Sequence, residues 1–222
     1  MKGKLIVLEG TDGSGKSTQF RALCQRLNQA GVPYRHAVFP RYDQPSSALI
    51  RMYLGGEFGT DPANVNAYAA SAFYAVDRYA SYKQDWEEWY LQGGLVLCDR
   101  YTTSNAVHQA GKVAPEERES FLHWLYDFEF GKLGLPAPDL VLYLDMPTDM
   151  TVHLLRDRET ATHTQADIHE RDTSYLTQCR RTAQEVSDVL GWEKIPCMEA
   201  GKLRTIADIS QDIWDRVSRL LG

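Results

Sequence analysis

Two things that the chain has little of exclude broad classes of protein. Its four cysteines are far apart and contain no Cys-x-x-Cys pair, which disfavours a disulfide framework or a zinc site and favours reduced thiols. No apolar run approaches the roughly 20 residues that a membrane-spanning helix needs. The apolar start at residues 1–7 is too short for a signal peptide. We therefore expect a cytoplasmic protein without a membrane partner.

Positive charge is also in short supply. Lysine and arginine total 24 against 30 acidic residues, for a net charge of -6, whereas a protein that binds a nucleic acid polymer needs a basic surface. No Ser-, Pro- or Gly-rich linker, internal repeat or low-complexity segment divides the 222 residues. With 43% hydrophobic residues, the chain can bury one good core, and we expect a single domain over residues 1–222.

Short apolar runs alternate with helical patterns along the chain. Such runs, each separated by a helix, predict an α/β fold in which a five-stranded parallel sheet is covered by helices on both faces. The predicted strands are residues 4–9, 34–39, 94–98, 139–144 and 193–197. Pro196 makes the last of these an edge strand or a weak prediction. Helices are predicted near residues 16–30, 45–54, 64–91, 115–131, 148–157, 169–190 and 205–221.

The most informative segment follows the first predicted strand. Gly10-x-x-x-x-Gly15-Lys16-Ser17 has the form of a Walker A phosphate-binding loop between a strand and a helix. Its glycines let successive backbone N–H groups face a phosphate chain, Lys16 adds a positive charge, and the Ser17 hydroxyl is a ligand for Mg²⁺. A three-layer P-loop fold that binds a nucleoside triphosphate and Mg²⁺ is therefore predicted. The expected nucleotide-binding residues are Gly10, Thr11, Asp12, Gly13, Ser14, Gly15, Lys16, Ser17 and Thr18.

Ligands of parallel α/β sheets bind beyond the carboxyl ends of the strands, and polar residues follow four of the predicted strands here. The third strand is followed by Asp99 and Arg100. Asp99 is a candidate to hold Mg²⁺, directly or through water, while Arg100 contacts a phosphate. The alternative is that Asp99 caps the next helix and pairs with Arg100 on the surface.

Several motifs in order together resemble the thymidylate kinase family, over residues of about 4 to 190. Asp-Arg-Tyr followed by Ser-Asn, and the Pro-Asp-Leu entry to the fourth strand, are more particular to that family than the phosphate loop. The motifs are Glu9–Thr18, Phe39-Pro-Arg-Tyr42, Asp77-Arg78, Asp99-Arg-Tyr-x-x-Ser-Asn105, Leu135-Pro-x-Pro-Asp-Leu140 and Asp167-Ile-His-Glu-Arg-Asp172.

The resemblance implies roles for the residues that match these motifs. Asp12 would reach the sugar 3′-hydroxyl and the magnesium shell, and Arg41 would contact the acceptor phosphate. Tyr74 would stack on the thymine ring, and Arg78, one helical turn further, would bond to a base carbonyl. The remaining acceptor-site residues implied are Phe39, Arg100, Ser104, Asn105 and His108. The metal site would comprise Ser17, Asp99 and Asp12.

Each of these residues also has a less specific interpretation. Asp12 can merely shape its turn, and Arg41 can be a solvated loop residue. The helix at 64–91 is dense in aromatic residues, so helical spacing alone favours packing over base binding. Because relatives pair through helices, the same stretch is a candidate homodimer surface.

The segment at about 156–170 has little apolar periodicity and resembles a mobile lid that closes over the phosphates. Some family members carry a catalytic arginine in the phosphate loop and others in the lid. Gly13 occupies the loop position here, which makes Arg156 and Arg158 the candidates. The alternative is a solvated, charged helix end. His108 stands where relatives usually have an aromatic residue near the deoxyribose, so discrimination against a 2′-hydroxyl is expected to differ.

The sequence thus predicts transfer of the ATP γ-phosphoryl group to thymidine 5′-monophosphate (dTMP), with Lys16, Arg41, Arg100 and a lid arginine neutralising charge. One alternative is a kinase for another nucleoside monophosphate or for a deoxynucleoside, whose neutral hydroxyl would need a base such as Glu9. Another is a nucleotide-binding switch, although no Asn-Lys-x-Asp guanine-reading sequence occurs.

Overall fold

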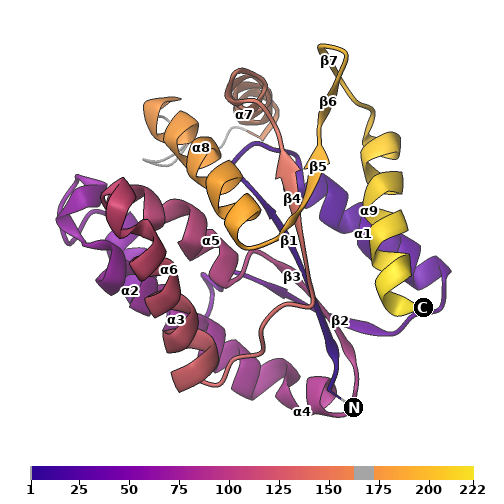
Figure 1. The fold of residues 1–222 in the computed structure, drawn as a ribbon, viewed down its shortest axis with the longest axis horizontal. Coiled ribbons are helices and arrows are strands. Elements are labelled where there is room, and N and C mark those ends of the chain that lie inside the picture. The colour runs from indigo at the N-terminus through magenta and orange to yellow at the C-terminus, as the bar shows by residue number, and fades with distance from the viewer. Residues whose placement is uncertain (1, 163–172) are drawn as a thin grey trace. The chain divides into compact units, whose positions relative to one another are not determined.

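The computed structural model describes the backbone of residues 2–162 and 173–222, without the side chains of 62, 156–162 and 173–175. Five strands form one parallel sheet of order β2-β3-β1-β4-β5, flanked by helices (Figure 1). This confirms the predicted fold class. The five strands are β1 (Lys4–Gly10), β2 (Tyr34–Val38), β3 (Leu95–Asp99), β4 (Leu140–Asp145) and β5 (Glu193–Pro196).

The helices agree closely with the predicted stretches, with one omission. The short α5 was not predicted, because Thr-Thr-Ser-Asn at its start is typical of caps and turns. The α-helices are α1 (Lys16–Gln29), α2 (Ala48–Leu54), α3 (Ala67–Ser81), α4 (Glu87–Leu91), α5 (Thr102–His108), α6 (Arg118–Tyr126), α7 (Thr148–Thr162), α8 (Thr173–Val189) and α9 (Ile206–Leu221).

Shorter elements fill the connections between these helices and strands. Two π-helical turns, η3 (Tyr82–Trp86) and η6 (Asp127–Lys132), interrupt stretches predicted as continuous helix. A small hairpin follows β5. The 3₁₀ turns and hairpin strands are η1 (Pro45–Ser47), η2 (Pro62–Asn64), η4 (Ala110–Lys112), η5 (Pro115–Glu117), β6 (Met198–Glu199) and β7 (Lys202–Leu203).

The chain forms two compact units. Residues 6–34 and 139–222 form the first, which we call the phosphate-loop unit, and residues 1–5 and 35–138 form the second, the helical unit. In the phosphate-loop unit, β1 pairs with β4 in the register Val7↔Val141, and β4 pairs with β5 in the register Leu144↔Ile195. The strand of Pro196 is therefore at the edge of the sheet, as its proline predicted.

Helix α9 packs against α1 in the phosphate-loop unit (Figure 1). Its residues Ile209, Ile213 and Val217 recur every fourth position and are buried, as expected for one apolar face of a helix. The Thr205 hydroxyl caps its first turn by accepting from the Asp208 N–H at 3.1 Å. Gln19 of α1 donates to the Ile206 carbonyl of α9 at 3.1 Å. This polar contact fixes how α9 is placed along α1.

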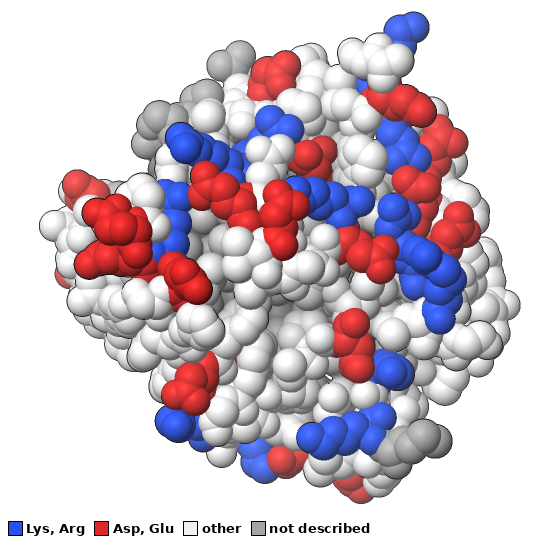
Figure 2. Space-filling view, viewed as in Figure 1, with Lys and Arg blue, Asp and Glu red and all other residues white. Residues whose placement is uncertain are grey.

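Charged side chains of both signs lie next to one another on the face drawn in Figure 2. In the phosphate-loop unit many form ion pairs, such as Arg204 with Asp212 at 2.7 Å and Lys194 with Asp188 at 2.7 Å. Interspersed charges of this kind give no continuous basic track for a polymer backbone. Among the described residues, none of the helices is both long and apolar enough to cross a lipid bilayer.

In the helical unit, Lys112 joins three segments. Its Nζ donates to the Tyr53 hydroxyl of α2 at 2.7 Å and to the Val65 carbonyl at 3.3 Å. It also lies 4.9 Å from the centroid of the Tyr53 ring. Desolvation by burial lowers the pKa of Lys112 to about 8, against an opposing effect of Asp61.

This lowered pKa predicts a specific pH dependence of stability. Between pH 8 and 10 the unfolded chain keeps the Lys112 proton and the folded chain releases it, so the Lys112 contribution to the free energy of unfolding rises with pH. Allowing for partial exposure, wild type should gain about 1 kcal/mol relative to Lys112→Met over this range. Urea unfolding of both proteins from pH 7.5 to 10 measures the difference; parallel stability curves would contradict it.

Candidate active site

The phosphate loop connects β1 to α1. Gly13 and Gly15 have φ values of 77° and 82°, a left-handed conformation that glycine adopts without a steric cost. The Ser14 N–H donates to the Thr11 carbonyl at 3.1 Å, which closes the turn. Gly15 is the N-cap of α1 and provides no side-chain cap. The first N–H groups of this helix are thus suited to an anion.

Polar groups within the loop also fit a phosphate ligand. Among the described residues, the buried Ser14 Oγ has no hydrogen-bond partner, an uncommon state for a buried hydroxyl that a ligand relieves. Thr11 and Lys16 are buried as well, whereas Ser17 is exposed at the start of the helix. Asp12, partly exposed, lies in the turn itself.

Gly13 is enclosed by α7. A Cβ at this position would lie 2.8 Å from the Thr151 carbonyl oxygen and 2.7 Å from Leu155 Cγ. Because a carbonyl of the main chain cannot move aside cheaply, no side chain fits here. The loop position that carries an arginine in some family members is therefore closed in this chain.

In the helical unit, Arg41 follows β2 and is held by Asp77 of α3. Its backbone N–H donates to Asp77 Oδ2 at 2.8 Å, and its Nε donates to Asp77 Oδ1 at 3.3 Å. Nη1 donates to Asp85 Oδ2 at 2.6 Å and Nη2 to Ser46 Oγ at 3.0 Å. Arg41 is thus a largely buried, ordered residue, and its interpretation as a solvated loop residue is wrong.

Arg100 follows β3 in a strained backbone conformation. Its φ of 67° is rare for a residue with a side chain and is found most often at functional sites. Its Nη1 lies 3.3 Å from Ser104 Oγ and 3.2 Å from His108 Nε2, both on α5. The residue at the N-cap position of α5 is Tyr101, which provides no side-chain cap.

Arg78 is fully buried in an ion pair with Glu129. Its Nε donates to Glu129 Oε2 at 2.7 Å, its Nη2 to Oε1 at 2.5 Å, and its Nη1 to the Tyr101 carbonyl at 3.3 Å. Glu129 also accepts from Thr102 Oγ1 at 2.7 Å and Asn105 Nδ2 at 3.4 Å. The carboxylate thus joins α3 to α5, and the guanidinium adds the link to Tyr101, just after β3.

Tyr74 lies on α3 one turn before Arg78. It packs against a hydrophobic cluster that includes Tyr53. Burial raises its pKa, and Tyr42 and Tyr53 raise it further, while the charges of Arg100 and Arg78 oppose them. The helical unit therefore brings the predicted acceptor residues Tyr74, Arg78 and Arg100 together. Phe39 is buried beside Tyr101, with the ring centroids 6.1 Å apart.

The family model named "Thymidylate kinase" matches residues 8–200. The chain belongs to the thymidylate kinase family. It is 32% identical to the thymidylate kinase of Mycobacterium tuberculosis over 195 residues, covering 85% of this chain and 87% of the relative. It is 29% identical to that of Afipia carboxidovorans, covering 100% of this chain and 91% of the relative.

The fold agrees with the same family. A solved thymidylate kinase structure from Candida albicans matches with a TM-score of 0.69 at 21% identity, covering 98% of this chain and 92% of that one. The activity of this thymidylate kinase is phosphorylation of dTMP by ATP. The function predicted from the sequence is thus confirmed.

Two groups of residues complete the comparison with the sequence predictions. Residues 163–170 of the predicted lid, and the side chains of Arg156 and Arg158, lie outside the described residues. The first residues of the predicted lid belong to helix α7, which runs to Thr162. Sequence reasoning missed Glu129, the partner of Arg78, which reads as an ordinary charged residue in a helix. It also missed Arg180 of α8, whose Nε donates to Asp145 Oδ1 at 3.0 Å at the end of β4.

The enclosure of Gly13 predicts unequal effects for two loop glycines. Gly13→Ala and Gly15→Ala both place a side chain at positive φ, at a cost of about 1 kcal/mol each. Only Gly13→Ala adds a clash, because a Cβ at Gly15 meets nothing within 4 Å. We expect Gly13→Ala to lower the free energy of unfolding by about 1–3 kcal/mol more than Gly15→Ala, measured by urea denaturation. Equal losses would contradict the described packing.

Proposed function

We propose that the helical unit binds dTMP and the phosphate-loop unit binds ATP, and that residues 1–222 act together as one kinase domain. The observation that carries the acceptor half is the position of Tyr74, an aromatic ring under the influence of the two cations Arg78 and Arg100. An aromatic face beside positive charge suits a base attached to a phosphate.

The donor half of the proposal uses the phosphate loop. Residues 10–18 cradle the ATP phosphates, and Lys16 interacts with the β- and γ-phosphates. The Ser17 hydroxyl is a ligand of Mg²⁺. The carboxylate of Asp12 reaches the magnesium shell, and that of Asp99 holds the ion directly or through water. Mg²⁺ usually takes only one or two protein ligands directly and keeps water or substrate oxygens as the rest. The ion, when bound, neutralises charge on the phosphates.

The acceptor site would divide between sugar, base and phosphate. Asp12 accepts a hydrogen bond from the sugar 3′-hydroxyl, Tyr74 stacks on the thymine, and Arg78 reaches a base carbonyl with N–H groups that its three described bonds do not use. His108, whose Nε2 lies 3.2 Å from Arg100 Nη1, lies by the deoxyribose. The other acceptor residues in the proposal are Phe39, Arg41, Arg100, Ser104 and Asn105.

The chemistry requires alignment more than proton abstraction. The 5′-phosphate of dTMP is already an anion near neutral pH. One of its oxygens bonds to the γ-phosphorus while the bond to the β–γ bridging oxygen breaks, giving dTDP and ADP. Lys16, Arg41, Arg100 and one of Arg156 and Arg158 neutralise the developing charge. The enclosure of Gly13 supports a lid arginine over one from the loop.

A deoxynucleoside kinase is less well supported. Its neutral acceptor would need a base such as Glu9. Glu9 is buried, and its Oε1 accepts a hydrogen bond from the Gly10 N–H at 2.9 Å. This contact fits a structural role of Glu9 in the phosphate loop better than a role as a catalytic base.

The decisive experiment measures ADP release with each nucleoside and nucleoside monophosphate as acceptor. We expect stimulation by dTMP and little by thymidine, because only the former supplies a phosphate for Arg41 and Arg100. Lys16→Ala should keep the far-ultraviolet circular dichroism of the wild type and lose about 10²-fold or more in kcat. Equal stimulation by thymidine, or wild-type turnover in Lys16→Ala, would overturn the assignment.

We also propose a cytoplasmic homodimer. None of the four cysteines in the described residues forms a disulfide, which suits a reducing compartment. Tyr68 of α3 is 41% exposed and contacts Trp124 of α6 edge to face, with ring centroids 4.6 Å apart. Val76 and Tyr79 continue this exposed stripe along α3. An aromatic, uncharged helix face of this kind suits an isologous interface.

A charge in this stripe should break the dimer. Val76 is 51% exposed, so Val76→Glu costs little in the monomer but buries a carboxylate in an interface. We expect the molar mass from light scattering at micromolar concentration to halve. Val189→Glu, on the exposed end of α8 in the other unit, is the matched control and should leave the mass unchanged. A dimeric Val76→Glu protein would exclude this surface.

A further inference from the structure

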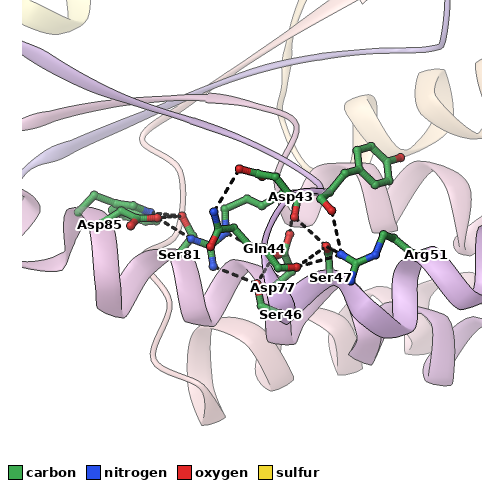
Figure 3. A network of polar contacts seen from close by, with 11 residues as sticks. Asp43, Gln44, Ser46, Ser47, Arg51, Asp77, Ser81 and Asp85 are labelled. Carbon is green, nitrogen blue, oxygen red and sulfur yellow. Dashed lines mark hydrogen bonds and ion pairs between the residues drawn. The ribbon is translucent and has the colours of Figure 1, made fainter.

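Asp77 is the centre of the polar network around Arg41. Besides the backbone N–H and Nε of Arg41, its carboxylate accepts from Ser46 Oγ at 2.5 Å. Ser46 in turn accepts from Arg41 Nη2 at 3.0 Å. Figure 3 shows Asp77 and Ser46 facing each other between α3 and the segment that follows β2. A single carboxylate thus holds both the main chain and the guanidinium of one arginine.

The two acidic partners of Arg41 differ in burial. The side chain of Asp77 is 1% exposed and that of Arg41 11%, whereas that of Asp85 is 53% exposed. A charge pair out of water is screened little, and loss of one partner is costly. An exposed pair contributes only about 0–1 kcal/mol. The orientation of Arg41 therefore depends on Asp77 much more than on Asp85.

Helix geometry explains why these groups meet. Asp77, Ser81 and Asp85 are spaced by four residues and lie along one face of α3 and the π-helical turn η3. Ser81 Oγ donates to Asp85 Oδ2 at 3.2 Å and accepts from Trp86 Nε1 at 3.2 Å. Asp77 and Asp85 on this face bind residues 41 and 46 of the segment that follows β2.

The rest of the segment is fastened independently. Ser47 Oγ donates to the carbonyls of Arg41 at 2.7 Å and Gln44 at 2.9 Å. Arg51 Nη1 donates to the carbonyls of Tyr42 at 2.8 Å and Gln44 at 3.0 Å. When Asp77 is changed, the turn loses the bond from the Arg41 N–H but keeps these four. The larger effect of Asp77 is therefore on the direction of the Arg41 side chain.

We propose that Asp77 is a positioning residue for the acceptor phosphate: it aims the Arg41 guanidinium, with Ser46 as the bridge between the two. This inference rests on the proposed role of Arg41 in binding the dTMP phosphate. A pre-aimed arginine loses less side-chain entropy when the phosphate binds. Asp77 acts on dTMP only through Arg41 and does not touch the substrate.

The test is a double-mutant cycle of Asp77→Asn and Arg41→Gln. Asparagine keeps the shape of Asp77 but exchanges one acceptor oxygen for a donor. It therefore cannot serve the Arg41 main chain, the guanidinium and Ser46 together. We expect KM for dTMP to rise about tenfold, since a bond to a charged group contributes about 1.5–3 kcal/mol. KM for ATP should stay within about twofold. Because Arg41 also neutralises developing charge, kcat should fall as well, but by less than in Arg41→Gln.

Two further variants serve as controls. Asp85→Asn removes the exposed partner, and KM for dTMP should change by less than about twofold. Ser46→Ala removes only the bridge; KM for dTMP should rise severalfold while the melting temperature stays at the wild-type value. If Asp77→Asn does not fold, Ser46→Ala decides, and an unchanged KM for dTMP in that variant overturns the proposal.

The cycle separates this inference from the proposed function. If Arg41→Gln leaves KM for dTMP unchanged, the role of Arg41 at the acceptor phosphate is wrong. If Arg41→Gln raises it and Asp77→Asn adds nothing in the double variant, Asp77 acts through Arg41 as proposed. If instead the two effects multiply, Asp77 acts elsewhere and the positioning role is wrong.

Discussion

The acceptor half of the molecule depends on the buried ion pair of Arg78 and Glu129. Both side chains are removed from water, with Glu129 at 0% exposure, so either charge alone would be strongly unfavourable. Here the carboxylate accepts four hydrogen bonds and the guanidinium donates three. Because these bonds reach α3, the end of β3 and α5 at once, the pair fixes the elements that carry Tyr74 and Arg100.

Two adjacent residues of α3, Asp77 and Arg78, bind different segments of the helical unit. Asp77 and Arg78 are neighbours in sequence and point to different parts of the unit, since successive side chains of a helix turn by about 100°. Asp77 holds the chain after β2 through Arg41, while Arg78 holds the π-helical turn after α6 through Glu129. Each of these two buried charges has an opposite partner, which lets both lie inside the unit.

The strands and the phosphate loop were predictable because their signals are local. Continuous apolar runs and a glycine pattern between a strand and a helix need no knowledge of distant residues. The partners of the site residues were not predictable in this way. Glu129 lies between two phenylalanines in a π-helical turn, and a π-helical turn changes which side of a helix a residue faces. Asp145 ends β4, and its pairing with Arg180, 35 positions later, leaves no trace in local sequence.

The two units offer different groups to a phosphate: backbone N–H groups in one and arginine side chains in the other. In the phosphate-loop unit, the proposed site offers backbone N–H groups to the ligand. The loop there has glycine at positive φ and, at Gly13, leaves no room for a side chain. In the helical unit, guanidinium groups do this work, and each needs a scaffold: a carboxylate for Arg41 and for Arg78, and a strained backbone with Ser104 and His108 for Arg100. A backbone cradle suits any triphosphate. Aimed arginines beside an aromatic ring suit one acceptor. With the proposed roles of these arginines, selectivity for dTMP would reside in the scaffold that aims them as much as in the arginines themselves.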